Sequence, residues 1–503
     1  MMMLSVKQHG RPKVLGVNFG VSMLSVVQRV RPKVLGVRFW VSLYVVANVL
    51  ATILAKHAYS KAKLIWLLKR LVGATFNMYS PVRTPLVISG PGSTKQIGQV
   101  IRNMGCKRPL VVTDEMLVKF GIAARCIGSI DQEGLQHTLY DGVVPDPHSE
   151  LVEEGYELYK RDGCDSIIAI GGGSPMDVAK VIGAKVVNPK PVKDYQGFFK
   201  VNMFSFKSLP PFIAVPTTAG TGSETTMGAV ITLRDENAKI TIGDFGLVPN
   251  VAVLDPEIVV NLPKALTAAT GMDALTHAIE AYMSGWQGPY SKKCSTSATA
   301  KIFQDLAKSF NDGSDLCARE SMLKASFEAG LAITRANVGY VHAIAHQIGA
   351  MFHMAHGEAN AMLLPHVLGF YIHDESQSWC HCTNLLCQLA EAANLKEHYD
   401  VGSFECKHAV AREFVARIAE LNELFSLPSV VEQMKAEHVE EIATRALKEA
   451  HGETFPITSL AALVDSGYPV PRYMTHDECK CIVAKVLPPG EHALWIQSVK
   501  QPR

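Results

Sequence analysis

The pattern of apolar and polar positions divides the chain near residue 260. Before this point, short continuous apolar runs alternate with stretches of helical periodicity, which is typical of βαβ units. The clearest apolar runs span residues 108–114, 166–170 and 212–215. They contain many β-branched residues and predict strands of a parallel sheet that is covered on both faces. From Leu262 onward, the periodicity is that of long helices with few strand signals.

These patterns predict two domains after a leader over residues 1–80. We expect an α/β, Rossmann-like nucleotide-binding domain over residues 81–260 and an all-α domain over residues 261–503. A composition of 48% hydrophobic and 19% charged residues excludes a disordered or fibrous protein. The 11 cysteines include no CxxC pair, so we expect free thiols.

The leader differs from the rest of the chain in charge. It carries twelve Lys and Arg residues and no acidic residue, whereas the remaining 423 residues hold 37 basic and 47 acidic residues. Acid-free basic leaders are typical of mitochondrial transit peptides, so we expect a mitochondrial location, with a cytoplasmic one as the alternative. The uncharged run over residues 39–55 is just long enough to leave a membrane anchor open. The acidic body argues against nucleic acid as a partner.

A glycine-rich turn follows the apolar run at 166–170. It reads Gly171-Gly172-Gly173-Ser174-Pro175-Met176-Asp177 and continues with helical periodicity. Because glycines lack Cβ atoms, the free N–H groups of a helix N-terminus can approach a phosphate, and the turn predicts a pyrophosphate site. We expect Ser174 to be the helix N-cap and Asp177 to complete a capping box. A tight turn without a ligand is the alternative.

A second polar loop, PTTAGTGSE over residues 216–224, follows the run at 212–215. It lies at the carboxyl end of a predicted strand, where open α/β sheets bind their ligands. Asp114 ends the strand predicted over 108–114. Its carboxylate either accepts a hydrogen bond from a ribose hydroxyl, which favours NAD over NADP, or caps the next helix.

The helical half contains a concentration of histidines. Asp273 and His277 are spaced i and i+4, so both reach the same side of a helix. Four more histidines follow at His342, His346, His353 and His356. We expect the first three of these to share one helical face. Imidazoles beside a carboxylate are typical ligands of Fe²⁺, Zn²⁺ or a similar ion, and a core histidine cluster without metal is the alternative.

Four motifs together resemble the group III, iron-dependent alcohol dehydrogenase family. They are GGGSPMD at 171–177, PTTAGTGSE at 216–224, LPKALTAATGMDALTHAIEAY at 262–282 and NVGYVHAIAHQIGAMFHMAHGEANAMLLPHV at 337–367. The resemblance extends from about residue 85 to residue 487 and is nearest in character to lactaldehyde reductases and to butanol or propanediol dehydrogenases. It implies a dehydroquinate synthase-like fold, in which the all-α C-terminal domain binds the metal. It also implies a homodimer.

The resemblance assigns roles to individual residues. The metal ligands correspond to Asp273, His277, His342 and His356. His346 corresponds to a non-ligand histidine near substrate and nicotinamide, and we expect it to relay the alcohol proton. The positions that bind NAD(H) correspond to Asp114, Gly172, Gly173, Ser174, Asp177, Thr217, Thr218, Thr221 and Lys239. One departure is Asp146, where the family commonly has Asn; a carboxylate there is expected to weaken cofactor binding slightly.

The resemblance implies an NAD-dependent enzyme that interconverts a short-chain primary alcohol or diol and its aldehyde. The reaction would be a metal-assisted hydride transfer, with Fe²⁺ or another divalent ion such as Zn²⁺. One alternative is a mitochondrial transhydrogenase that passes hydride between a hydroxyacid and an oxoacid, which the basic leader favours. An alternative of another class is a catalytically silent scaffold tethered to a membrane, which requires the run at 39–55 to be an anchor.

Overall fold

The computed structural model describes six stretches of the chain. They are residues 82–201, 208–236, 238–373, 380–395, 403–452 and 467–500. The predicted leader, with its apolar run at 39–55, lies outside these residues. Within them, none of the helices has both the length and the apolar character that a membrane crossing requires. All 11 cysteines are free, as expected.

The first half of the described chain is built around a six-stranded sheet. Its strands are β1 (Leu86–Ser89), β2 (Pro109–Val112), β3 (Thr138–Tyr140), β4 (Ser166–Gly171), β6 (Phe212–Pro216) and β9 (Val251–Leu254). All neighbouring strands are parallel, in the order β1-β9-β6-β4-β2-β3. The three predicted strands become β2, β4 and β6, and every residue in them is buried.

Helices cover both faces of this sheet, as the continuous apolar runs predicted. One face packs against α7 (Ser149–Arg161) and α8 (Gly173–Val187). A smaller sheet, formed by β5 (Gly197–Phe198), β8 (Ala238–Gly243) and β7 (Gly228–Leu233), extends this layer. The opposite face packs against α4 (Ile97–Asn103) and α6 (Ile122–Gln132). The short α5 (Glu115–Lys119) follows β2.

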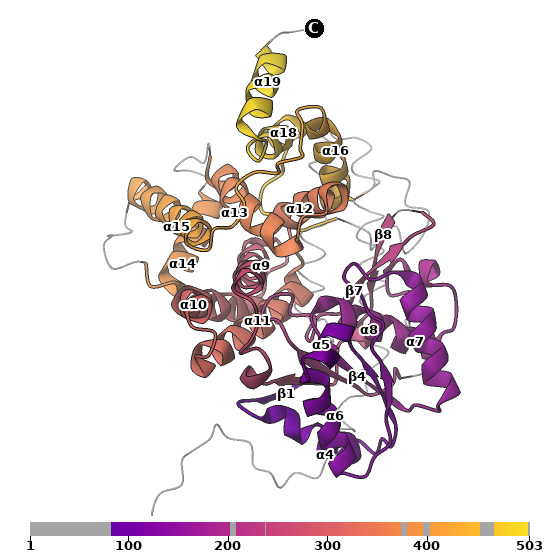
Figure 1. Ribbon diagram of the computed structural model, residues 1–503. Helices are drawn as coiled ribbons and strands as arrows, with labels where there is room; N and C mark the ends of the chain where they lie inside the picture. Colours follow the sequence, from indigo (N-terminus) through magenta and orange to yellow (C-terminus); the bar gives the residue numbers. More distant parts are fainter. Residues whose placement is uncertain are drawn as a thin grey trace, which may run out of the picture.

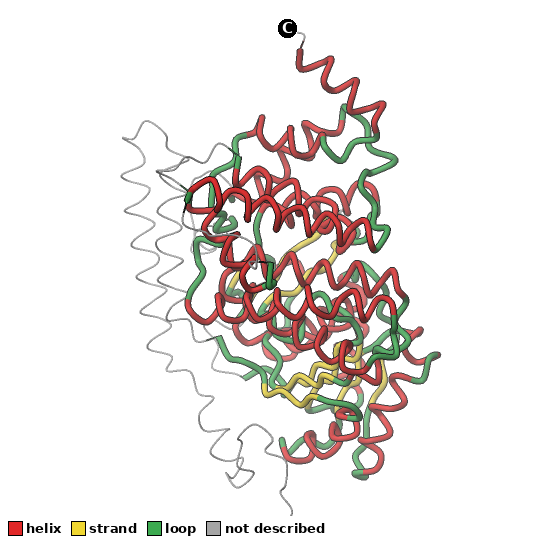
Figure 2. Tube along the Cα trace, turned by 90° about the vertical axis from the view of Figure 1, so that its left-hand side faces the viewer, coloured by secondary structure: helices red, strands yellow, loops and turns green. Residues whose placement is uncertain are grey.

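From Lys264 onward, the described chain is helical. The helices are α9 (Lys264–Met283), α10 (Pro289–Asn311), α11 (Leu316–Ala336), α12 (Tyr340–Phe352), α13 (His356–Ile372), α14 (His381–Ala392), α15 (Phe404–Leu424), α16 (His438–His451), α18 (His476–Ala484) and α19 (Pro489–Lys500). α9 is buried over nearly its whole length, because α10, α11, α13 and α14 surround it (Figure 1). The helices stack on the sheet-containing half (Figure 2), and the predicted fold class is confirmed.

The two halves meet at the loop that follows β6. A Cβ atom on Gly222 would lie 2.7 Å from the Cα of Gly330 in α11, so the two backbones are in contact. Gly222 also has a φ of +60°, which glycine adopts without strain. Phe327 and Leu331 of α11 join the core beneath the sheet. The polar loop is therefore held between the sheet and the helical half.

Candidate metal and nucleotide site

Four side chains of the helical half converge on one point. They are Asp273, His277, His342 and His356, and one ligand atom of each lies within 4.8 Å of the others. The Oδ1 atom of Asp273 is 3.8 Å from the Nε2 atoms of His277 and His342 and 3.5 Å from that of His356. Asp273, His277 and His342 are buried, whereas the side chain of His356 is 42% exposed.

Three helices bring these residues together. Asp273 and His277 lie one turn apart on α9, and His342 lies in the first turn of α12. The prediction that His353 shares a helical face with His342 and His346 is wrong. The helix ends at Phe352, and His353 adopts a left-handed conformation with a φ of 54° and is exposed to solvent. The chain turns there, and His356 returns to the cluster as the first residue of α13.

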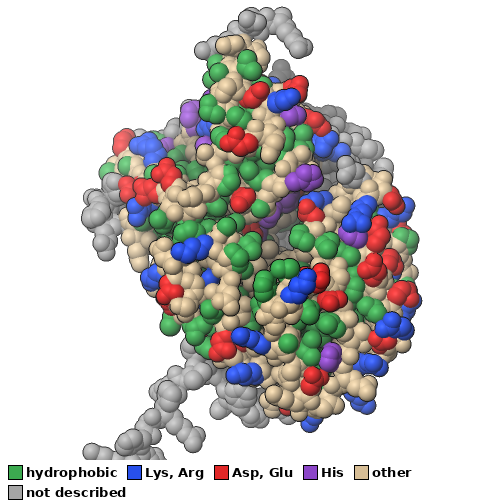
Figure 3. Space-filling model, in the orientation of Figure 1, with side chains coloured by type: hydrophobic (Ala, Val, Ile, Leu, Met, Phe, Trp, Pro, Cys, Tyr) green, Lys and Arg blue, Asp and Glu red, His purple; other side chains and the backbone are tan. Residues whose placement is uncertain are grey.

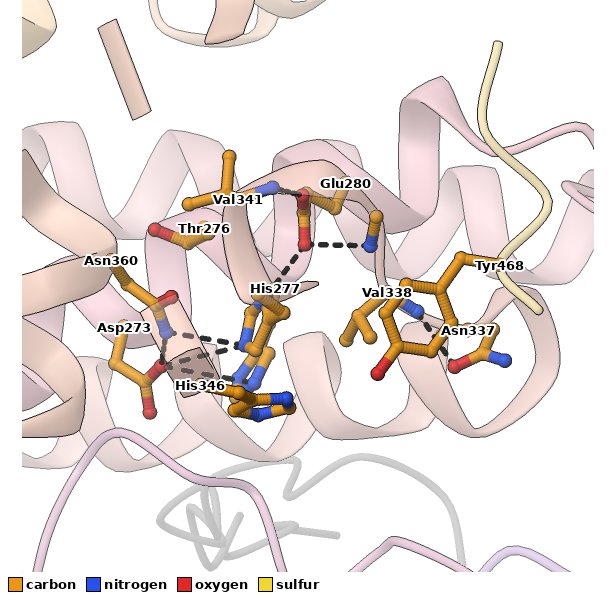
Figure 4. A network of polar contacts seen from close by, with 12 residues as sticks. Asp273, Thr276, His277, Glu280, Asn337, Val338, Val341, His346, Asn360 and Tyr468 are labelled. Carbon is orange, nitrogen blue, oxygen red and sulfur yellow. Dashed lines mark hydrogen bonds and ion pairs between the residues drawn. The ribbon is translucent and has the colours of Figure 1, made fainter. Parts of the chain in front are cut away.

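A buried carboxylate orients one of the four side chains. Glu280 lies on α9, and its Oε2 atom is 2.6 Å from Nδ1 of His342. The same carboxylate accepts hydrogen bonds from the backbone N–H groups of Gly339 and Val341 (Figure 4). Burial raises the pKa of Glu280 to about 7, although these hydrogen bonds oppose the rise. When ionised, Glu280 requires the proton of His342 on Nδ1 and leaves the Nε2 lone pair directed at the cluster.

Asn360, one turn after His356 on α13, completes the surroundings of Asp273. Its Nδ2 donates to Oδ1 of Asp273 at 2.8 Å and lies 3.2 Å from Nε2 of His342 (Figure 4). The side chain is fully buried. The amide therefore fixes the carboxylate at the centre of the four residues.

The protonation states suit a cation. Burial, together with the neighbouring imidazoles, holds the pKa of His342 well below its ordinary value. Burial lowers the pKa of His356 to about 4. Both rings are therefore neutral near pH 7, which is the form that binds metal. Three imidazoles and one carboxylate, fixed at mutual distances below 5 Å, fit a divalent ion such as Fe²⁺ or Zn²⁺.

His346 lies beside this cluster without belonging to it. Its ring stacks on the ring of His356 with 5.3 Å between centroids, and its Nδ1 is 2.6 Å from Oε1 of Glu449. Its side chain is 36% exposed. On the face shown in Figure 3, histidine side chains reach the surface at a hollow between the two halves.

The two predicted nucleotide loops are in contact. A Cβ atom on Gly172 would lie 3.3 Å from Oγ1 of Thr218, and one on Gly173 would lie 3.3 Å from Cγ2 of Thr221. Thr217 donates its backbone N–H to the carbonyl of Gly171. The glycines thus expose the N-terminus of α8 beside a row of threonines.

The predicted capping of α8 is wrong. The helix begins at Gly173 with Gly172 as its N-cap, so Ser174 lies inside the first turn, and no side chain caps the helix. The Asp177 carboxylate instead accepts from Oγ of Ser223 at 3.0 Å and from N of Val230 at 2.9 Å. Contacts with the following loop and with β7 therefore replace the local capping box.

A buried lysine ties the same region together. Nζ of Lys180 donates to Oγ of Ser223 and Oγ1 of Thr226 and lies 3.8 Å from Asp177. Burial lowers the pKa of Lys180 to about 8, although the charge of Asp177 opposes the fall. Burial likewise raises the pKa of the nearby Glu224 to about 7. These contacts fix the loop after β6 against α8.

Two further predicted cofactor residues have partners of their own. Asp114 is the N-cap of α5, with Oδ1 accepting from N of Leu117 at 2.9 Å, which leaves its second oxygen for another donor. Nζ of Lys239 is 2.5 Å from Oδ1 of Asp146. The charge of Lys239 opposes the protonation of His356 and His346, but Glu449 outweighs burial and this charge and raises the pKa of His346. The departure at Asp146 therefore supplies a partner for Lys239.

Sequence reasoning did not assign roles to Glu280, Asn360 or Glu449. Two of them carried a signal: Glu280 lies seven residues after Asp273, and Asn360 lies four after His356, so each shares a helical face with a residue of the cluster. Glu449 lies 103 residues from His346 and carried no such signal.

The chain matches two family models along most of the described residues. The model "Iron-containing alcohol dehydrogenase" matches residues 84–256, and "Fe-containing alcohol dehydrogenase family, C-terminal" matches residues 267–463. The NAD-dependent methanol dehydrogenase of Bacillus methanolicus is 35% identical over 374 residues, which are 74% of this chain and 94% of that protein. The 1,3-propanediol dehydrogenase of Klebsiella pneumoniae is 40% identical over 280 residues, which are 55% and 71% of the two chains.

Solved structures of alcohol dehydrogenases have the same fold as this chain. A crystal structure of 1,3-propanediol oxidoreductase has a TM-score of 0.72 and 32% identity, and the match covers 80% of this chain and 98% of that one. The alcohol dehydrogenase of Oenococcus oeni has a TM-score of 0.71 and 31% identity over the same shares. The chain belongs to the iron-containing alcohol dehydrogenase family and is an oxidoreductase that acts on alcohols. Enzymes of this family use NAD(H) and a divalent metal.

Proposed function

We propose that the protein interconverts a short-chain primary alcohol or diol and its aldehyde, with NAD(H) as hydride carrier and a divalent ion, Fe²⁺ or a similar metal, as Lewis acid. The convergence of Asp273, His277, His342 and His356 within 4.8 Å carries this proposal. The relatives named for methanol and 1,3-propanediol support the class of substrate.

In this proposal, the four converging residues hold the ion. When bound, the ion lowers the pKa of an alcohol hydroxyl and polarises an aldehyde carbonyl. Glu280 and Asn360 keep His342 and Asp273 in the geometry that binding requires. The exposed edge of His356 marks the side from which substrate approaches. His346 relays the alcohol proton outward through Nε2.

The sheet-containing half holds the dinucleotide. The backbone N–H groups at the start of α8 bind the pyrophosphate, because Gly172 and Gly173 leave them uncovered. In this proposal, the dinucleotide also contacts Ser174, Thr217, Thr218, Thr221 and Lys239. Asp177 supports this site without contacting the dinucleotide, because both of its oxygens accept hydrogen bonds from the adjoining loop and strand.

Asp114 provides a test of the nucleotide site. Its uncommitted oxygen would accept from a ribose hydroxyl and repel a 2′-phosphate. Replacement of Asp114 by Ala should therefore raise kcat/KM with NADP relative to NAD. An unchanged ratio of these two values would restrict Asp114 to its role as the cap of α5.

The decisive experiment combines metal analysis with an NADH absorbance screen. The protein is loaded anaerobically with Fe²⁺ and assayed with short alcohols, diols and hydroxyacids. His342→Ala and His356→Ala should lose the bound metal and NADH formation together, because each removes one of four ligands. Undiminished activity in a variant shown to lack metal would refute the proposal.

One arm of the assay addresses the transhydrogenase hypothesis, which the basic leader supports. It supplies 4-hydroxybutyrate and 2-oxoglutarate without free NAD. An alcohol dehydrogenase that exchanges its coenzyme remains inactive in this mixture. Turnover there, without turnover of simple alcohols, would favour the transhydrogenase.

A further inference from the structure

A carboxylate from the C-terminal part of the chain lies behind His346. Glu449 is the third residue from the end of α16, and its Oε1 is 2.6 Å from Nδ1 of His346. The side chain of Glu449 is 28% exposed. It contacts the Nδ1 edge of the imidazole.

Two donors fix this carboxylate. The hydroxyl of Tyr468 donates to Oε1, and Nε2 of Gln347 donates to Oε2 at 2.8 Å. Gln347 follows His346 directly on α12, so α12 holds Glu449 at two adjacent positions. Burial raises the pKa of Glu449, but the charge of His346 and the surrounding hydrogen bonds outweigh it and leave the pKa lowered.

An ionised carboxylate can only accept hydrogen bonds, so it determines where the imidazole carries its proton. His346 must present N–H at Nδ1, and in the neutral ring the lone pair then lies on Nε2. Within the part of the chain that the structure describes, this Nε2 has no hydrogen-bond partner. The ring is 36% exposed, stacks on His356 and meets the ring of His342 edge to face with 5.9 Å between centroids, so it lies beside the metal site.

We propose that Glu449 is a positioning residue, which fixes the ring and tautomer of His346 so that Nε2 accepts a hydrogen bond from the substrate hydroxyl. Glu449 acts through His346 and does not touch the substrate itself. This inference rests on the proposed function, because it requires an alcohol at the metal site. Tyr468 and Gln347 hold the carboxylate in place.

A double-mutant cycle tests the inference. Glu449→Gln, His346→Ala and the double variant are compared by kcat/KM for the alcohol, after bound metal and the Kd for NADH have been measured in each. Glu449→Gln should lower kcat/KM at least about tenfold, because a positioned acid–base group contributes about 10²- to 10⁴-fold. Metal content and NADH affinity should stay at the wild-type level.

The double variant separates positioning from a structural role. If Glu449 acts through His346, the double variant should match His346→Ala within about twofold, because the carboxylate has nothing left to position. Losses that multiply in the double variant, or a Glu449→Gln variant as active as wild type, would overturn the inference. Glu441→Gln, on the same helix but paired with Arg445 at the surface, is the matched control and should leave activity unchanged.

A spectroscopic measurement keeps the test independent of activity. In protein labelled with ¹⁵N at histidine and loaded with diamagnetic Zn²⁺, the nitrogen shifts of His346 should report the tautomer protonated at Nδ1. An Nε2-protonated ring in the wild type would refute the inference. If the wild type oxidises no alcohol with NAD, the proposed function fails instead, while the tautomer still decides whether Glu449 orients His346.

Discussion

Replacement of Glu280 by Gln should weaken metal binding although Glu280 is not one of the four converging residues. The carboxylate accepts three hydrogen bonds, from Nδ1 of His342 and from the backbone N–H groups of Gly339 and Val341. A carboxamide has one oxygen, and its NH₂ group cannot accept. At least one buried donor therefore loses its acceptor, which costs about 1–3 kcal/mol of folding stability.

The effect on the metal follows from the tautomer of His342. The new NH₂ group can donate to Nδ1, which favours a ring protonated at Nε2. That proton occupies the lone pair that faces Asp273 and the other imidazoles. Partners of metal-ligating histidines typically contribute about 10- to 100-fold in affinity, so we expect the metal Kd of Glu280→Gln to rise by about this factor.

The assay is a competition titration against a metal chelator, together with thermal unfolding of the metal-free and metal-loaded proteins. The stabilisation gained on metal loading should be smaller in the variant than in the wild type. Glu328→Gln is the control, since it removes a partly buried carboxylate on α11 that pairs with Lys301 instead. A Glu280→Gln variant with the metal affinity of the wild type would contradict the proposed role of Glu280.

Three further predictions concern regions outside the metal cluster. Burial raises the pKa of Glu224 to about 7 from an ordinary 4.5, so between these two pH values the folded protein keeps a proton that the unfolded chain releases. The free energy of unfolding therefore falls as the pH rises from 4.5 to 7. Glu224→Gln should abolish this fall, so chemical denaturation should show a gain on the order of 3 kcal/mol at pH 8 and little change at pH 4. Gly330→Ala would place a Cβ 2.2 Å from Oγ1 of Thr225. It should therefore lower the free energy of unfolding by about 1–3 kcal/mol in the same denaturation measurement and weaken NADH binding in fluorescence titrations. Burial raises the pKa values of Cys126 and Cys479 to about 12, so neither should be alkylated by iodoacetamide at pH 8, whereas mass spectrometry should find the exposed Cys317 modified.

The sequence predicted the architecture because burial leaves a direct pattern. A strand covered on both faces, such as Ser166–Gly171, is apolar over nearly its whole length, and a helix at the centre of a bundle, such as α9, is buried around its whole circumference. The convergence of Asp273 with His277 was likewise local, since a spacing of four places both on one face. These features require no knowledge of the rest of the chain.

The capping of α8 was not predictable in the same way. The residues from Ser174 to Asp177 satisfy the local rule for a capping box, and an isolated peptide would favour it. In the folded protein, the hydroxyl of Ser223 and the backbone N–H of Val230 both donate to the Asp177 carboxylate. A partner 46 residues away thus outweighs a partner three residues away, and the helix begins two residues earlier than predicted.

The end of α12 shows a similar limit. His353 continues the helical spacing of His342 and His346, and nothing in its own residue type stops a helix. The helix ends because the chain must turn there for His356 to reach Asp273, which requires the left-handed conformation of His353. Periodicity predicts which residues share a face only as far as the helix extends.

The contacts of the polar loop explain how the two halves act together. A Cβ on Gly220 would lie 2.6 Å from Cβ of Thr270, which stands three residues before Asp273 on α9. The loop proposed to bind the dinucleotide therefore rests on the helix that carries two of the proposed metal ligands. Hydride transfer requires the carbinol carbon and the nicotinamide to be held within a few tenths of an ångström of their reactive separation. A direct backbone contact between the two supporting elements provides this constraint, because close-packed interiors yield little to displacement.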